Sequence, residues 1–190
     1  MARLFLIHVS ADFPDSVSQQ KTPVIKRLVE VVSHEFDQQV YSLNRATPPL
    51  ASWSWPKPEV QFRDERDGLC SVLYAAPPRG IHHRRQLRAL GEALAERIGT
   101  GTRPDMIIGH KLTVEGIAVA RAAQVLGVPY ALSIQGNTDA KILSARPDLR
   151  AEFARIFHDA AVVFPFAPWL WPGSRRSSGS AAGLRSCYPA

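Results

Sequence analysis

One segment, residues 103–136, constrains the fold more than any other part of the 190-residue chain. The apolar run 106–108 (Met-Ile-Ile) is followed by a stretch of helical length and then by 127–129 (Gly-Val-Pro). Glycine is favoured just past the end of a helix, and proline prevents the helix from continuing. The mostly apolar segment 130–134 then predicts another buried strand. Strand, helix and strand in this order indicate a parallel crossover unit.

The same alternation of strands and helices extends through most of the chain. Short apolar runs are typical of buried strands, and apolar residues three or four apart are typical of helices. The predicted strands are 4–7, 39–43, 69–74, 106–108, 130–134 and 161–164. One predicted helix begins at Thr22-Pro23, and the others span 81–98, 113–126 and 148–159. We therefore predict an α/β fold, a three-layer Rossmann-like parallel sheet with helices on both faces.

Two stretches lack any such period. Residues 45–67 are rich in proline, tryptophan and charge, and we predict a long loop with at most short elements. From Gly173 onward the chain consists mainly of Ser, Arg, Gly, Ala and Pro. Because the alternation stops near Pro168, we predict a folded domain, 1–168, and an irregular or disordered tail, 169–190.

Several classes of function have no support in the sequence. Gly-x-Gly-x-x-Gly does not follow the first strand, and no Gly-x-x-x-x-Gly-Lys loop or Gly-x-Ser-x-Gly elbow occurs. Cys70 and Cys187 lack the spacing of a metal site, so we predict neither a metal nor a cofactor. No apolar run approaches about 20 residues, which predicts a cytoplasmic protein. Three tail arginines supply half of the net charge of +6, so nucleic acid is not an expected partner.

Polar residues cluster after three of the predicted strands. In an open parallel sheet, ligands bind beyond the carboxyl ends of the strands, so these residues are the candidates for substrate binding. They are Asp12, His110, Lys111, Glu115, Gln135, Gly136 and Asp139. We assign no catalytic residue, because Glu115 has no second carboxylate at a spacing that defines a hydrolytic pair.

Each candidate also has a purely structural interpretation. A histidine near the end of a buried strand is often a structural, hydrogen-bonded residue, and this interpretation applies to His8 and His110. Thr113 is a plausible N-cap of the helix that follows, and Asp139 is a plausible N-cap of a short helix after 136–138. The basic run 82–85 is interpreted as a solvated helix face.

Residues 104–110, 127–129 and 133–139 follow one another in an order that resembles the N-terminal domain of glycosyltransferase family 4 proteins. Members of that family commonly read Pro-Asp, an apolar run and His, then Gly-apolar-Pro, a strand and His-Gly-x-Asp. The segments 12–14 and 41–45 add to the resemblance, which covers about residues 3–166.

The resemblance implies the N-terminal half of a GT-B fold and a retaining transfer from a nucleotide sugar, the co-substrate of the complete enzyme. This domain is expected to orient the acceptor, which in the family is a polysaccharide, a lipid-linked sugar or a small molecule. The family implies no metal. Peripheral contact with the inner membrane face is also implied, and Trp53 and Trp55 beside Lys57 suit it; packing of these tryptophans within their own loop is the alternative.

Two departures from the family pattern affect the expected function. Gln135 stands where the family has histidine, and a neutral amide cannot accept a proton. No second α/β domain follows the strand at 161–164, which we interpret as an out-of-frame end, so we expect no sugar transfer by this chain alone. The alternative function is a non-catalytic, Rossmann-like binding module for a glycan or another polar ligand.

Overall fold

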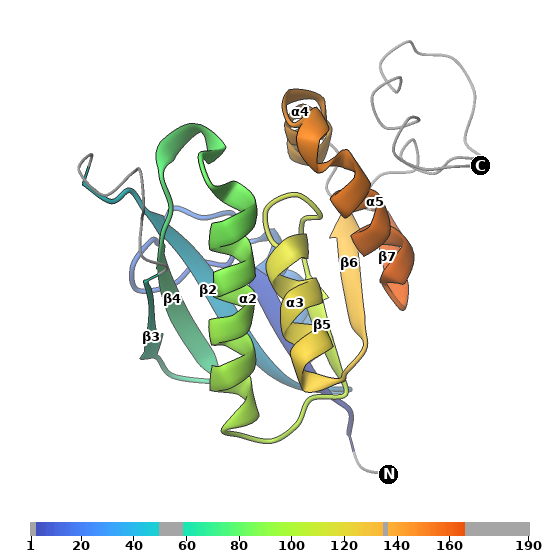
Figure 1. Ribbon diagram of the computed structural model, residues 1–190. Helices are drawn as coiled ribbons and strands as arrows, with labels where there is room; N and C mark the ends of the chain where they lie inside the picture. The colour runs from blue at the N-terminus through green and yellow to red at the C-terminus, as the bar shows by residue number, and fades with distance from the viewer. Residues whose placement is uncertain (1–2, 50–58, 135–136, 166–190) are drawn as a thin grey trace.

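A computed structural model describes residues 3–49, 59–134 and 137–165 of the chain. Its centre is a seven-stranded sheet with the order β3-β4-β2-β1-β5-β6-β7 (Figure 1). Every neighbouring pair is parallel except β3 and β4, which are antiparallel. The strands are β1 Phe5–Ser10, β2 Asp37–Ala46, β3 Val60–Asp64, β4 Leu69–Ala75, β5 Met106–Gly109, β6 Tyr130–Ile134 and β7 Val162–Pro165.

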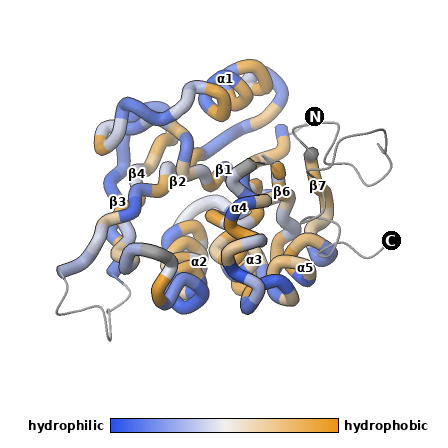
Figure 2. Tube along the Cα trace, turned by 90° about the horizontal axis from the view of Figure 1, so that it is seen from above, coloured by the Kyte–Doolittle hydropathy of each residue, from blue (hydrophilic) through white to orange (hydrophobic). Residues whose placement is uncertain are grey.

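Helices cover both faces of this sheet. The helices are α1 Val24–Val31, α2 His83–Gly99, α3 Gly116–Leu126, α4 Asn137–Ala145 and α5 Arg150–Asp159. Seen from above, α1 lies on one face and α2, α3 and α5 lie on the other (Figure 2). The predicted α/β, three-layer, Rossmann-like fold is therefore confirmed. No helix within the described ranges is long and apolar enough to cross a membrane.

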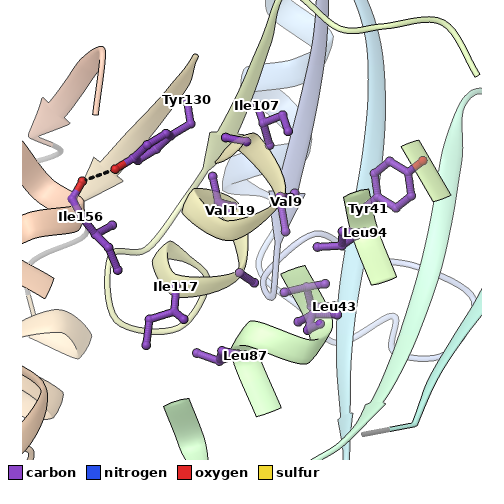
Figure 3. Packing of buried hydrophobic residues seen from close by; sticks show 14 of the residues in the cluster. Val9, Tyr41, Leu43, Leu87, Leu94, Ile107, Ile117, Val119, Tyr130 and Ile156 are labelled. Carbon is purple, nitrogen blue, oxygen red and sulfur yellow. Dashed lines mark hydrogen bonds between the residues drawn. The ribbon is translucent and has the colours of Figure 1, made fainter. Parts of the chain in front are cut away.

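The main core lies between the sheet and the α2–α3–α5 layer. Val9 and Ile107 from the sheet meet Leu94 of α2 and Val119 of α3 in this core (Figure 3). The Tyr130 hydroxyl donates to the Ile156 carbonyl oxygen at 2.6 Å, which connects β6 to α5. A smaller core of Phe13, Ile25 and Val40 packs α1 onto the opposite face.

Helices α2 and α3 approach each other very closely at Gly91. A Cβ atom on Gly91 would lie 2.5 Å from the Ala118 carbonyl oxygen and 2.7 Å from the Arg121 Cβ. Such distances are not tolerated between real atoms, so only glycine allows this contact. The close packing therefore sets the distance between α2 and α3.

Several predicted boundaries differ from those of the structure. The predicted loop at 45–67 contains β3, which reverses into β4 through Asp67 and Gly68, both with positive φ. The helix predicted from 113 begins at Gly116. The helix predicted from 148 begins at Arg150, after a 3-10 turn. Gly127 ends α3 with a φ of 63°, as its position predicted.

Some predictions lie outside the described residues. They are the domain boundary near Pro168, the tail 169–190 and the tryptophans Trp53 and Trp55.

Candidate functional site

The buried carboxylate of Glu115 joins the loops that follow β1 and β5. Its Oε1 accepts a hydrogen bond from the Ala11 amide at 2.7 Å. Its Oε2 accepts from the amides of His110 and Lys111 at 2.6 and 2.5 Å. The side chain is fully buried, and these bonds hold the two loops together.

Burial and hydrogen bonding act in opposite directions on Glu115. Burial disfavours the charged carboxylate and raises its pKa to about 8. The three backbone N–H groups and the nearby Lys111 charge favour the carboxylate and oppose that rise. The net shift places the titration of this internal anchor within the physiological range.

Asp12 and Lys111 form an ion pair at the same place. Lys111 Nζ lies 2.6 Å from Asp12 Oδ2, and both side chains are largely buried. Three of the predicted residues, Asp12, Lys111 and Glu115, are thus brought together by the ends of β1 and β5. Their role in substrate binding remains a prediction.

His8 and His110 form part of a buried chain of hydrogen bonds. Gln38 donates its amide to the Val29 carbonyl oxygen at 3.0 Å, so its Oε1 accepts from His8 Nε2 at 2.9 Å. His8 Nδ1 must then accept from His110 Nε2, 3.1 Å away. The two rings are stacked, with centroids 5.3 Å apart. This arrangement leaves His110 Nδ1 as a buried acceptor that has no partner among the described residues.

Both histidines are held in the neutral form. Burial lowers the pKa of His8 to about 4, and burial together with the neighbouring His8 lowers that of His110 to about 3. The geometry therefore fits the structural interpretation of both residues. Neither imidazole is arranged to exchange a proton with a ligand near pH 7.

Asp139 binds the loop after β5. Two helix caps predicted from the sequence, at Thr113 and Asp139, are not found in the structure. Its Oδ1 accepts from the Thr113 amide at 2.8 Å and from the Thr113 hydroxyl at 2.6 Å. Thr113 was predicted to cap the following helix, but that helix begins at Gly116 and its cap position, Glu115, makes no side-chain capping bond. Asp139 lies inside the first turn of α4 and not at its cap. Gln135 and Gly136 lie outside the described residues.

A cavity of about 520 Å³ opens beside this cluster, at the carboxyl ends of β1, β2 and β4. Much of its wall is apolar, with Ala11, Leu43, Leu87, Val114 and Ile142 among the lining residues. Its polar lining residues are Ser18, Lys21, Asn44, Arg45, Tyr74, His83 and Gln86. Its volume lies within the range of about 300–1,000 Å³ that is usual for small-molecule sites.

Three polar lining residues, Lys21, Asn44 and His83, are held by partners within the fold. Asn44 Nδ2 donates to Asp15 Oδ2 at 2.6 Å and to the Ser42 carbonyl oxygen at 3.3 Å. Lys21 Nζ lies 3.1 Å from Asp15 Oδ2 and also donates to the Ser42 hydroxyl and the Leu43 carbonyl oxygen. His83 Nε2 donates to the Thr113 carbonyl oxygen at 3.2 Å. These three side chains shape the cavity wall.

Gln86 and Arg45 differ from them. Gln86 is 3% exposed, and its Nε2 has no hydrogen-bond partner among the described residues. A buried donor without a partner costs about 1–3 kcal/mol. Arg45 donates through Nε to the Ala76 carbonyl oxygen at 3.2 Å and through Nη2 to that of Pro77. No ion pair joins Arg45 to a described carboxylate.

Sequence reasoning missed Arg45 and Gln86 as candidates. Arg45 lies near the carboxyl end of β2, and Gln86 lies in the first turn of α2, which follows β4. The rule that directed attention to the loops after β1, β5 and β6 applies equally to these strand ends. Within the described ranges, no group of three or more His, Cys, Asp or Glu residues is arranged to hold a metal ion.

No family model and no curated sequence matches the chain. Solved structures share its fold. One is an α,α-trehalose-phosphate synthase (UDP-forming) from Burkholderia xenovorans in complex with glucose-6-phosphate, with a TM-score of 0.50 and 11% identity over 85% of this chain. Another is described as "Trehalose-6-phosphate from E. coli bound with UDP-2-fluoro glucose", with a TM-score of 0.50 and 9% identity over 84% of this chain. The chain spans only 39–40% of their lengths, and likeness at this identity concerns the fold alone.

Proposed function

We propose that this chain is the acceptor-side domain of a retaining, nucleotide-sugar-dependent glycosyltransferase and that the cavity at the carboxyl edge binds the acceptor sugar. The observation that supports this most directly is the composition of the cavity wall, which combines apolar side chains with the polar side chains of Tyr74 and Gln86. Sugars present both apolar ring faces and hydroxyl groups. A mixed wall of this kind suits them better than a purely apolar or a strongly charged one.

The resemblance to glycosyltransferase family 4 and the fold shared with trehalose-phosphate synthases support the same proposal. In it, the nucleotide sugar is the co-substrate, and no metal or other cofactor is needed. The acceptor is a polysaccharide, a lipid-linked sugar or a small molecule, bound in the cytoplasm or at the inner membrane face. The contribution of this domain is to hold the acceptor in a fixed orientation.

A second candidate, a sugar-binding module without chemistry, is favoured by one observation. The acid and base side chains at this edge are committed to the fold: Glu115 binds backbone amides, and His8 and His110 bind each other. The described residues therefore offer no free general base beside the cavity. The two candidates agree on binding and differ on transfer.

Binding can be tested by isothermal titration of the purified chain with glucose, maltose, glucose 6-phosphate and UDP-glucose. Ile81 lines the cavity and is 42% exposed, so Ile81→Trp should block it without disturbing the core. Val125→Trp, on α3 away from the cavity, is the matched control. We expect a sugar to bind wild type and Val125→Trp and not Ile81→Trp. Binding of no sugar, or equal binding to Ile81→Trp, would overturn the proposal.

Transfer is measured separately, as release of UDP from UDP-glucose in the presence of the sugar that binds. We expect none from the 190-residue polypeptide, because the sequence holds no glycine-rich loop for the diphosphate. UDP release coupled to formation of a glycoside would exclude the binding-module candidate.

A further inference from the structure

The charges around the cavity are not balanced. Among the described lining residues, Lys21 and Arg45 are cationic, and none is an aspartate or a glutamate. Lys21 is neutralised by Asp15, with which it forms a largely buried ion pair. Arg45 has no such partner among the described carboxylates, so it gives the cavity a net positive charge.

The guanidinium of Arg45 is already oriented by the fold. Its Nε and Nη2 donate to the backbone carbonyl oxygens of Ala76 and Pro77, beyond the end of β4. These bonds fix the plane of the group and leave Nη1 without a hydrogen-bond partner among the described residues. A planar, pre-oriented guanidinium is well suited to phosphate and carboxylate oxygens, and charge-assisted bonds of this kind are stronger than neutral ones.

The second feature is the unpartnered amide of Gln86. This side chain is almost entirely buried, lines the cavity and has a donor, Nε2, with no acceptor in the described structure. Buried donors in folded proteins nearly always have a partner, so an oxygen atom of a bound molecule is expected to complete this site. A sugar hydroxyl supplies such an oxygen.

We propose that the ligand of this cavity is an anionic sugar, with its negative group on Arg45 and a hydroxyl oxygen on Gln86 Nε2. This inference rests on the proposed function and specifies its acceptor class. The negative group is a phosphate ester or a carboxylate, since both present the paired oxygens that a guanidinium recognises.

The test compares the affinities of glucose, glucose 6-phosphate, glucuronic acid and inorganic phosphate for the wild-type chain. The variants are Arg45→Met and Gln86→Leu, and the control is Arg63→Met, an exposed residue on β3 outside the cavity. We expect at least one anionic sugar to bind about tenfold or more tightly than glucose. Arg45→Met should remove that advantage, Gln86→Leu should weaken all three sugars, and Arg63→Met should change none.

Preference for glucose 6-phosphate identifies a phosphate ester, and preference for glucuronic acid identifies a carboxylate; either supports the inference. Glucose that binds as tightly as both anionic sugars would overturn it and leave the proposed function intact. Binding of inorganic phosphate without any sugar would contradict the proposed function itself.

Because Arg45 also bonds to backbone carbonyl oxygens, thermal melting is used to check that Arg45→Met is folded. A second measurement on the wild-type chain then decides: added salt should weaken an anionic sugar and leave glucose unchanged. Equal salt dependence for the two sugars would overturn the inference.

Discussion

The backbone amide and the hydroxyl of Thr113 both donate to the same oxygen of Asp139, at 2.8 and 2.6 Å. This pair connects the loop after β5 to α4 across 26 residues of sequence. Replacing Asp139 by alanine leaves the buried Thr113 amide without this acceptor. We expect Asp139→Ala to lower the free energy of unfolding by about 1–3 kcal/mol in urea titrations. Asp64→Ala, which removes an exposed ion pair with Arg97, should cost under about 1 kcal/mol, and equal losses would contradict this prediction.

Gly91 is expected to be intolerant of any side chain. Because its Cβ would lie 2.5 Å from the Ala118 carbonyl oxygen, Gly91→Ala must push α2 and α3 apart. Overpacking of this kind costs about 1–3 kcal/mol, which thermal and urea unfolding will report. Gly99 is the matched control on the same helix, since its Cβ would meet no atom closer than 3.6 Å. Gly99→Ala should be neutral or slightly stabilising, and a comparable loss there would show that the close contact is not the cause.

The titration of Glu115 should make the fold less stable as the pH rises. Its pKa is about 8 in the folded chain against an ordinary value of 4.5, so the folded state holds the proton more tightly. The resulting stabilisation is complete below about pH 4.5 and is lost as the pH rises through 8. We expect a contribution to the slope on the order of 1 kcal/mol per pH unit between these values. Glu115→Gln should remove it and exposed Glu59→Gln should not; parallel curves for wild type and Glu115→Gln would refute the prediction.

The histidine pair should contribute a pH dependence of the opposite sign. Burial lowers the pKa values of His8 and His110 to about 4 and 3, so the folded state binds fewer protons than the unfolded chain. Their contribution is present above pH 6.5 and is lost as the pH falls through about 4. His110→Phe should flatten unfolding free energies measured at pH 7, 6, 5 and 4. His34→Phe, on an exposed histidine, should retain the wild-type slope; a wild-type slope in His110→Phe would count against the prediction.

The crossover unit was the most predictable part of the fold, because its signals are local. Gly127 adopts the left-handed conformation that glycine favours and ends α3 where the sequence indicated. Strand β6 has the predicted bounds, and its five residues, four of them apolar, are all buried. Elements of this kind are determined by their own residues.

Strand β3 and the start of α2 depend on the surrounding structure instead. The residues of β3 are partly buried or exposed, so the strand has no strong apolar pattern. The turn that leads from β3 to β4 includes Asp67 with a positive φ, a conformation that the sequence would have indicated more clearly with glycine at that position. Helix α2 begins at His83 after His82 adopts a left-handed conformation without a capping side chain. No residue type in these segments indicates where β3 or α2 begins.

The same limit applies to the site. The strand-end rule located Asp12, Lys111, Glu115 and Asp139 correctly at one edge of the sheet. It did not indicate that Glu115 binds the backbone amides of Ala11, His110 and Lys111. Every residue type except proline has such an amide, so the sequence does not show which ones a carboxylate will bind. The unpartnered Gln86 amide is likewise apparent only after the packing around it is known.

The position of Glu115 has a mechanical consequence. One carboxylate fastens two loops that come from strands about 100 residues apart in the chain, and both loops border the cavity. The loop after β1 cannot move away without breaking its bond to Oε1, and the loop after β5 cannot do so without breaking its bonds to Oε2. The two loops on this side of the cavity are therefore mechanically coupled through Glu115, so a change that displaces its carboxylate frees both loops at once.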